Sequence, residues 1–302
     1  MTEKNYQKKL SIIVISTCHM TSLENCLSSI FTNETLEKIE IIVAVCNSEN
    51  LISDLTEKFP TVDFIQFREK VGIPILAAAG IEKSRGEIIA LTDSACVVDK
   101  NWIASIMRTH QSDLIIFGGA VEPFGKMKSL DLAAYFCEYG RFMPPLKSGV
   151  TEVLPGNNFS FKRSALKIGR EFTEPKFWKT FWCERLQKEN IKLILNTEIT
   201  VYYARKFSPA SFLVRRFQHG RCFAGMRIQP AAVSKRLFYI GGSIFLPFIF
   251  FYRIVSVVPG KKRFVKEFIR ASPFILLAVL SWSLGEFCGY LAGTGKSCDY
   301  ID

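Results

Sequence analysis

The first hundred residues alternate between short apolar runs and segments with helical spacing. Apolar runs at 10–16, 39–45, 62–67 and 88–91 are rich in Ile and Val and alternate little with polar residues. Such runs are typical of parallel strands that are covered on both faces. Between the first two runs, apolar residues recur at helical spacing over 23–30. This order of elements predicts an α/β fold built on a Rossmann-like, mostly parallel sheet with flanking helices.

The fourth apolar run ends abruptly in polar residues, because Thr92, Asp93 and Ser94 follow it directly. Folds of this class bind ligands at the carboxyl ends of parallel strands, so we expect Asp93 to reach a cleft. An Asp that only closes a turn is the alternative, and the pattern alone does not separate the two. The helix before this strand is expected to begin at Pro74 and to be closed by Gly86.

Small or polar residues also follow the other three runs, at Thr17, Asn47 and Gly72. No GxGxxG follows the first run, and no P-loop sequence occurs in the chain. A dinucleotide-dependent oxidoreductase is therefore poorly supported. The turn at Thr17 is short and polar, and we expect it to contact a nucleotide without a glycine cradle.

The positive charge of the chain is gathered in one block. The net charge is +11, and residues 203–270 hold fourteen Lys or Arg and a single acid. A basic block of this kind fits nucleic acid or an anionic membrane surface. Long apolar stretches at 237–258 and 273–292 adjoin the block. Because the second is close to the ~20 residues that a membrane-spanning helix needs, the membrane is favoured over nucleic acid.

The charge pattern does not settle how the chain would cross a membrane. If both apolar stretches span, the basic loop 261–270 lies opposite the basic flank 215–236, against the positive-inside tendency. A re-entrant or interfacial stretch at 237–258 would keep both basic segments on one side. Glu286 lies inside the second stretch, where an ionisable group suggests a function. Pairing with a neighbour such as Arg253 is the favoured alternative.

The nine cysteines form no CxxC pair and no metal-ligand spacing with the three histidines. Several of them, such as Cys26, Cys96 and Cys288, lie inside apolar runs. We expect small buried side chains in a reducing cytosol and no disulfide framework.

A series of segments along the chain resembles the family 2 glycosyltransferases. The segments are KLSIIVIST, SLENCLSSI, IEIIVAV, ALTDSAC and NWI, followed by GGAVEP, PGNNFSFKR and RLQKENIKL. The resemblance implies a GT-A fold over residues 1–225, with a nucleotide-sugar half at 1–123 and an acceptor half at 124–225. Residues 226–302 would then form a membrane-associated helical region.

The resemblance also implies which residues bind the donor and the acceptor. The family usually ends its fourth strand in Asp-x-Asp, whose second acid holds a divalent cation, but here Ala95 stands at that position. Mg²⁺ or Mn²⁺ would thus have Asp93 as its one acidic ligand, and a single carboxylate binds a hard cation weakly. Asn157 and Asn158 match a polar pair on the acceptor side. The implied donor-binding residues are Thr17, Asn47, Gly72, Asp93, Ser94, Arg216, Gln218 and Arg221.

A general base is harder to find in the sequence. The acidic pair of the family matches Trp178 and Lys179 here, and a protonated Lys is a poor base unless burial lowers its pKa. Glu174 and Glu184 are the nearest acids. For Glu184, a solvated ion pair with Arg185 or Lys188 is the favoured interpretation.

The resemblance implies a membrane-attached enzyme with its catalytic domain in the cytoplasm. It would move a hexosyl group from a nucleotide sugar to a hydroxyl of a lipid-linked or glycan acceptor, with inversion, as in the synthesis of cell envelope polysaccharide. A catalytically degenerate GT-A scaffold that binds a glycan, a nucleotide or a partner is the alternative, given Ala95 and Lys179. A nucleic-acid-binding module is disfavoured because the basic residues flank bilayer-length apolar runs.

Overall fold

The computed structural model describes residues 8–17, 20–33, 38–46, 51–228 and 233–301. They divide into two compact units. The first unit comprises Met1–Phe124 and Pro144–Ala204, and the second comprises Gly125–Met143 and Arg205–Asp302. The proposed boundary at residue 225 lies inside helix α7 (Pro209–Ile228) of the second unit.

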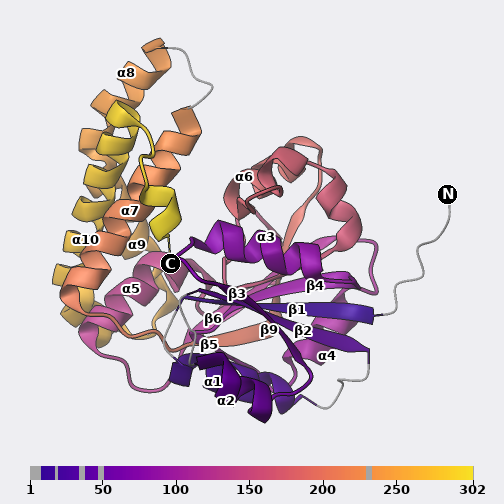
Figure 1. The fold of residues 1–302 in the computed structure, drawn as a ribbon. Coiled ribbons are helices and arrows are strands. Elements are labelled where there is room, and N and C mark those ends of the chain that lie inside the picture. Colours follow the sequence, from indigo (N-terminus) through magenta and orange to yellow (C-terminus); the bar gives the residue numbers. More distant parts are fainter. Residues whose placement is uncertain (1–7, 18–19, 34–37, 47–50, 229–232, 302) are drawn as a thin grey trace. The chain divides into compact units, whose positions relative to one another are not determined.

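The described part of the first unit is built on a nine-stranded sheet with the order β3-β2-β1-β4-β8-β6-β9-β5, in which β7 pairs with β9 (Figure 1). Strands β1, β2, β3 and β4 are parallel, with β1 between β2 and β4 and with β3 beside β2. Strand β8 lies between β4 and β6 and runs antiparallel to both. The strands are β1 Lys8–Ser16, β2 Ile39–Cys46, β3 Val62–Phe67, β4 Gly86–Asp93, β5 Cys96–Val98, β6 Ile116–Pro123, β7 Gly149–Thr151, β8 Asn158–Lys162 and β9 Leu193–Tyr203.

The α-helices of the first unit pack on this sheet. They are α1 Met20–Phe31, α2 Leu51–Lys58, α3 Ile73–Lys83, α4 Trp102–Thr109 and α6 Lys179–Lys188. One core cluster combines β1 and β4 residues such as Ile13 and Leu91 with Phe161 of β8 and Trp182 of α6. The four predicted strands and the α/β fold class are therefore confirmed. Strands β1, β2 and β4 are buried along almost their whole length, whereas β3, at the edge of the sheet, is only partly buried.

Gly86 does not close helix α3, which corrects one expectation. The helix ends at Lys83, and the backbone N–H of Ser84 donates to the carbonyls of Gly80 and Ile81. Gly86 is instead the first residue of β4, where a Cβ atom would lie 2.6 Å from the backbone nitrogen of Ser11 on β1. A glycine is required there by the close approach of the neighbouring strand.

The second unit is helical, and α7 and α10 lie side by side in it (Figure 1). Its α-helices are α5 Ser129–Tyr139, α7 Pro209–Ile228, α8 Val233–Gly242, α9 Leu246–Val257 and α10 Val265–Ala292. Gly285 of α10 would place a Cβ atom 2.2 Å from the carbonyl oxygen of Phe217. Glycine at this position therefore allows α10 to approach the backbone of α7 closely.

Two helical segments are long and apolar enough to cross a membrane, by length and composition only. They are Val233–Lys261, which is 6% buried over its most apolar window, and Val265–Ala292, which is 44% buried. The first segment contains a short 3₁₀ turn at Ser243–Phe245, and Pro247 lies in the first turn of α9. Aliphatic and aromatic side chains on α9, among them Phe248 and Tyr252, are exposed.

Two expectations for the second unit are wrong. Cys222 and Cys298 form a disulfide with a Cα–Cα distance of 5.0 Å, although no disulfide was expected. The carboxylate of Glu286 accepts hydrogen bonds from Trp282 Nε1 at 2.6 Å and from the Tyr290 hydroxyl at 2.7 Å, and these replace the expected pairing with Arg253. The disulfide joins residues 76 positions apart in the sequence, whereas Trp282 and Tyr290 each lie four residues from Glu286 on the same helix, α10.

Candidate active site

The carboxyl ends of β1, β3 and β4 lie on one edge of the sheet because the three strands are parallel. Thr17 follows β1, Gly72 precedes α3 after β3, and Asp93 and Ser94 end β4. Strand pairing thus brings four of the predicted donor-binding residues to this edge. Asn47 lies outside the described residues.

Asp93 is the last residue of β4 and is 9% exposed. It is in register with Ile15 of β1, whose carbonyl accepts a 2.9 Å hydrogen bond from the backbone N–H of Ser94. The Oδ1 atom of Asp93 accepts a 2.7 Å hydrogen bond from the backbone N–H of Ala95. One carboxylate oxygen therefore closes the turn, as the simpler interpretation expected, and the same bond fixes the carboxyl group at the sheet edge.

Four buried side-chain oxygens at this edge have no hydrogen-bond partner in the described part of the chain. They are Ser16 Oγ, Thr92 Oγ1, Ser94 Oγ and Asn157 Oδ1. An unsatisfied buried polar atom costs about 1–3 kcal/mol, so four of them in one place are typical of a site that a polar ligand or water completes. Ser16 and Thr92 were not among the predicted site residues. The available signal was a hydroxyl at the end of an otherwise apolar strand.

Asn157 lies beside Asp93 at the sheet edge. Thr92 of β4 pairs with Asn158 of β8, so Asp93 and Asn157 leave the antiparallel ladder at the same point. The Nδ2 atom of Asn157 donates to Cys96 Sγ at 3.2 Å. Burial, together with the negative charge of Asp93, raises the pKa of the Cys96 thiol well above its usual value. Cys96 therefore stays a neutral thiol, and Asp93 is the acidic group of this cluster.

Asn158 holds the sheet together from a fully buried position. Its Oδ1 atom accepts a 2.9 Å hydrogen bond from Trp102 Nε1, and its Nδ2 atom donates to the carbonyls of Ala120 at 2.8 Å and Ile199 at 2.9 Å. Both amide hydrogens are used inside the protein. We therefore interpret Asn158 as a scaffold residue that links α4, β6, β8 and β9, and the acceptor contact stays a prediction for Asn157.

Lys179 begins helix α6 and is partly buried. Its Nζ atom donates to the carbonyl oxygen of Leu154 and lies 5.9 Å from the ring centroid of Phe159. Burial lowers the pKa of this ammonium group. Phe159 pairs with Leu91 of β4, two residues before Asp93, so Lys179 lies over the strand next to the candidate site.

The two predicted catalytic acids are exposed. Glu174 pairs with Arg170 at 3.3 Å, where both side chains are largely solvent-accessible. Glu184 is exposed on α6, and the ion pair that the structure describes on this helix joins Arg185 and Glu189 at 3.0 Å. Screening by water keeps such surface pairs weak. A catalytic role for these acids stays a prediction.

The predicted diphosphate-binding residues belong to the second unit. Arg216 donates from Nη1 to Glu138 at 3.2 Å, and Arg221 donates from Nε to the carbonyl of Gly293 at 3.3 Å. Gln218 is partly buried on the same helix. Their contact with a nucleotide therefore stays a prediction.

A divalent cation would find few protein ligands at the sheet edge. The described residues contain no group of three or more His, Cys, Asp or Glu side chains that could hold a metal ion. Asp93 supplies one carboxylate and Ala95 supplies none. These side chains do not form a cation site by themselves, so we derive no step through a metal.

Parts of the chain are similar to a known protein family and to known proteins. A model described as "Glycosyl transferase family 2" matches residues 11–169. EpsH of Bacillus subtilis (strain 168), a candidate glycosyltransferase, is 30% identical over 120 residues, which are 37% of this chain and 35% of that protein. The glucosyl-dolichyl phosphate glucuronosyltransferase of Haloferax volcanii is 24% identical over 95 residues, or 30% of each chain. The matched part therefore spans about a third of the length of these relatives.

Two solved structures share the fold. The mannosyltransferase PcManGT from Pyrobaculum calidifontis, in complex with GDP-Man and Mn²⁺, superposes with a TM-score of 0.58 and 14% identity over 93% of this chain and 88% of that one. GalNAc-T7 with UDP, GalNAc and Mn²⁺ gives a TM-score of 0.53 and 14% identity over 66% of this chain and 44% of that one. At this identity, the likeness shows a GT-A-like fold and no more.

Proposed function

The chain belongs to glycosyl transferase family 2, and from this premise we propose that it transfers a sugar from a nucleotide-sugar donor to a hydroxyl acceptor. The observation that supports the proposal best is the set of unpartnered oxygens around Asp93, at Ser16, Thr92, Ser94 and Asn157. A nucleotide sugar carries hydroxyls that donate hydrogen bonds to oxygens. The site around Asp93 therefore has the hydrogen-bond acceptors that the hydroxyls of such a donor need.

The donor is proposed to lie across the carboxyl edge of the sheet. Thr17 and Gly72 follow β1 and β3 and would line the nucleotide, together with Asn47. Asp93 and Ser94, at the end of β4, would hold the part of the donor next to the diphosphate. Two structural neighbours are complexes with GDP-Man and with UDP, which makes nucleoside diphosphate sugars the first donors to test.

The chemistry is proposed to be an inverting displacement at the anomeric carbon. In such a step the acceptor oxygen attacks as the diphosphate leaves, and the protein accelerates it by orienting both partners and stabilising developing charge. The fixed carboxylate of Asp93 would orient the donor. Asn157, whose Oδ1 atom has no described partner, would orient the acceptor hydroxyl.

The acceptor is proposed to be lipid-linked or a growing glycan, and the enzyme to be attached to a membrane with the first unit in the cytoplasm. The segments Val233–Lys261 and Val265–Ala292 support the attachment by their length and hydropathy. The name of the Haloferax volcanii relative includes a dolichyl phosphate, which supports a lipid-linked acceptor.

A donor screen tests the proposal. The full chain in detergent would be heated with a panel of nucleotide sugars, with and without Mn²⁺, and the midpoint of unfolding recorded. A donor present at 100 times its Kd stabilises the protein by about 2.7 kcal/mol, which is a measurable upward shift. Absence of any shift and of any donor hydrolysis across the panel would count against a glycosyltransferase.

A degenerate scaffold is the second candidate, because Ala95 replaces an acid, and Ala95→Asp separates the two. Ala95 lies next to Asp93 in the turn after β4, so the substitution adds a second carboxylate there. We expect Mn²⁺ binding, measured by calorimetry, to tighten about tenfold or more, because hard cations gain affinity from accumulated charged oxygens. Ala95→Asn is the size-matched control and should bind Mn²⁺ as the unsubstituted protein does.

The outcome for transfer then distinguishes the candidates. An enzyme transfers sugar with Ala95 in place, whatever the rate of transfer after Ala95→Asp. A scaffold transfers no sugar in either form, although Ala95→Asp gives it Mn²⁺ binding. Equal Mn²⁺ affinity for Ala95→Asp and Ala95→Asn would show that this turn does not face the cation.

A further inference from the structure

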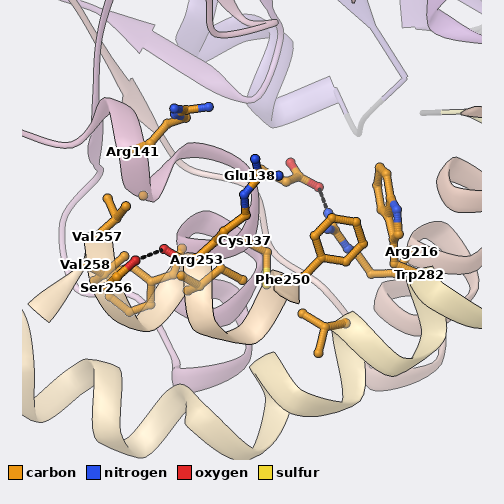
Figure 2. A pocket seen from close by; sticks show the side chains of 14 residues that line it. Cys137, Glu138, Arg141, Arg216, Phe250, Arg253, Ser256, Val257, Val258 and Trp282 are labelled. Atoms are coloured by element: carbon orange, nitrogen blue, oxygen red, sulfur yellow. Dashed lines mark hydrogen bonds and ion pairs between the residues drawn. The ribbon is translucent and has the colours of Figure 1, made fainter. Parts of the chain in front are cut away.

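The second unit contains a cavity of about 340 Å³ among α5, α7, α9 and α10 (Figure 2). Its walls are mainly apolar and aromatic, with Phe136 from α5, Phe250 from α9, and Val279 and Trp282 from α10. It is formed entirely by residues of one unit. None of its lining residues belongs to the sheet edge around Asp93.

Three guanidinium groups and one carboxylate line this cavity. They belong to Arg141, Arg216, Arg253 and Glu138. Glu138 accepts a hydrogen bond from Arg216 Nη1 at 3.2 Å, as Figure 2 shows, and this pairing balances one positive charge. The remaining charge of the lining is positive, which favours an anion.

Arg216 is the buried part of this basic lining. It is 7% exposed, and its guanidinium lies 4.6 Å from the ring centroid of Trp282. Its Nε atom has no hydrogen-bond partner in the described part of the chain. A buried guanidinium with an unused donor is costly unless a ligand satisfies it, and the planar fork of Arg suits phosphate oxygens.

The outer surface of α9 identifies the rest of the ligand. Phe248 and Tyr252 are each 73% exposed, and the most apolar window of Val233–Lys261 is 6% buried. Such a surface is covered by hydrocarbon when the helix lies in a bilayer. Phe250 and Arg253, from the same helix, line the cavity. An occupant that joins a phosphate to a hydrocarbon chain matches both the cavity and this helix.

We propose that the cavity binds the phosphate head group of an anionic phospholipid of the bilayer, with its acyl chains along α9. Arg216 and Arg253 hold the phosphate, Arg141 adds positive charge at the exposed end, and Trp282 forms part of the wall. The ligand is drawn from the surrounding bilayer. It is distinct from the nucleotide sugar of the proposed function.

Trp282 gives a direct readout of the occupant because it lines the cavity. The full chain in detergent would be titrated with phosphatidylglycerol brominated on its acyl chains, and with phosphatidylcholine brominated in the same way, while tryptophan fluorescence is recorded. We expect saturable quenching by the anionic lipid at a concentration about tenfold lower than by the zwitterionic one. Trp282→Phe should remove the saturable component.

Substitutions at the exposed arginines test the charge without disturbing a buried pair. Arg253→Gln should raise the half-quenching concentration of phosphatidylglycerol about tenfold for a lost charged hydrogen bond, and Arg141→Gln should raise it less, because Arg141 contributes positive charge without holding the phosphate. Arg253→Lys should recover part of that loss. Arg270→Gln is the matched control, since Arg270 is exposed on α10 and does not line the cavity.

Three results would overturn the proposal. Quenching by phosphatidylglycerol and phosphatidylcholine at the same concentration would show that the cavity does not select an anionic head group. If Arg270→Gln raised the half-quenching concentration as much as Arg253→Gln, the lipid would be attracted to the basic surface in general and not bound in the cavity. Release of the brominated lipid by micromolar isoprenyl phosphate, or by UDP or GDP, would assign the cavity to a carrier lipid or to the donor diphosphate. The donor screen of the proposed function does not depend on this cavity, so failure here leaves the proposed function standing.

Discussion

Asp93→Asn is expected to lower sugar transfer by about 10²- to 10³-fold while the protein remains folded. The substituted side chain keeps an oxygen that can accept the backbone hydrogen bond of Ala95, so the turn after β4 is retained. What it loses is the negative charge of the carboxyl group at the end of β4. Removing one preorganised electrostatic group from an active site typically costs about 2.7–4 kcal/mol of transition-state stabilisation.

The measurement is the initial rate of transfer with the best donor from the screen, together with the unfolding midpoint. Asp63→Asn is the matched control, because Asp63 lies near the amino end of β3 in the same sheet. It should leave the rate unchanged. An Asp93→Asn protein that is folded and keeps more than a tenth of the activity would remove Asp93 from the proposed mechanism.

The strands of the first unit could be predicted from the sequence because their burial is a local property. Each of β1, β2 and β4 is buried along almost its whole length, so each appears as a continuous apolar run. Gly86 could not be interpreted in the same way. In the sequence, a glycine that ends a helix cannot be distinguished from a glycine that is needed because a neighbouring strand is close. Only the structure shows that Ser11 of β1 lies against Gly86.

The candidate site was predicted in part. Thr17, Gly72 and Asp93 follow strands, and parallel strands bring their carboxyl ends together. The hydroxyls of Ser16 and Thr92 were missed, because a Ser or Thr near a strand end indicates a site only when its hydrogen-bond partners are known to be missing.

The second unit shows where local patterns fail. Arg216 lies on a helix that carries many basic residues, yet it is buried against Glu138, 78 residues away in the sequence. The disulfide of Cys222 with Cys298 joins residues separated by 76 positions and leaves no spacing motif. Pairings of this length depend on how helices pack, which the pattern of apolar residues leaves open.

Asn157 and Asn158 are adjacent in the sequence but have different surroundings. Asn158 makes three buried hydrogen bonds, whereas Asn157 has an oxygen without a described partner and donates to a sulfur. An amide that is fully engaged inside the protein stabilises the fold. An amide with a buried unused oxygen is available to a ligand. The pair therefore offers a comparison in which the site and the scaffold are one residue apart.

Asn158→Leu is expected to destabilise the protein by about 3–5 kcal/mol, because it leaves Trp102 Nε1 and the carbonyls of Ala120 and Ile199 buried without their partner. For a unit of this size, such a loss lowers the unfolding midpoint by about 10 °C, measured on the full chain by intrinsic fluorescence. Asn157→Ala is the matched control. It should shift the midpoint by no more than about 3 °C and weaken acceptor use instead. Equal shifts for the two variants would contradict the division between scaffold and site, because the buried oxygen of Asn157 would then be engaged as fully as the amide of Asn158.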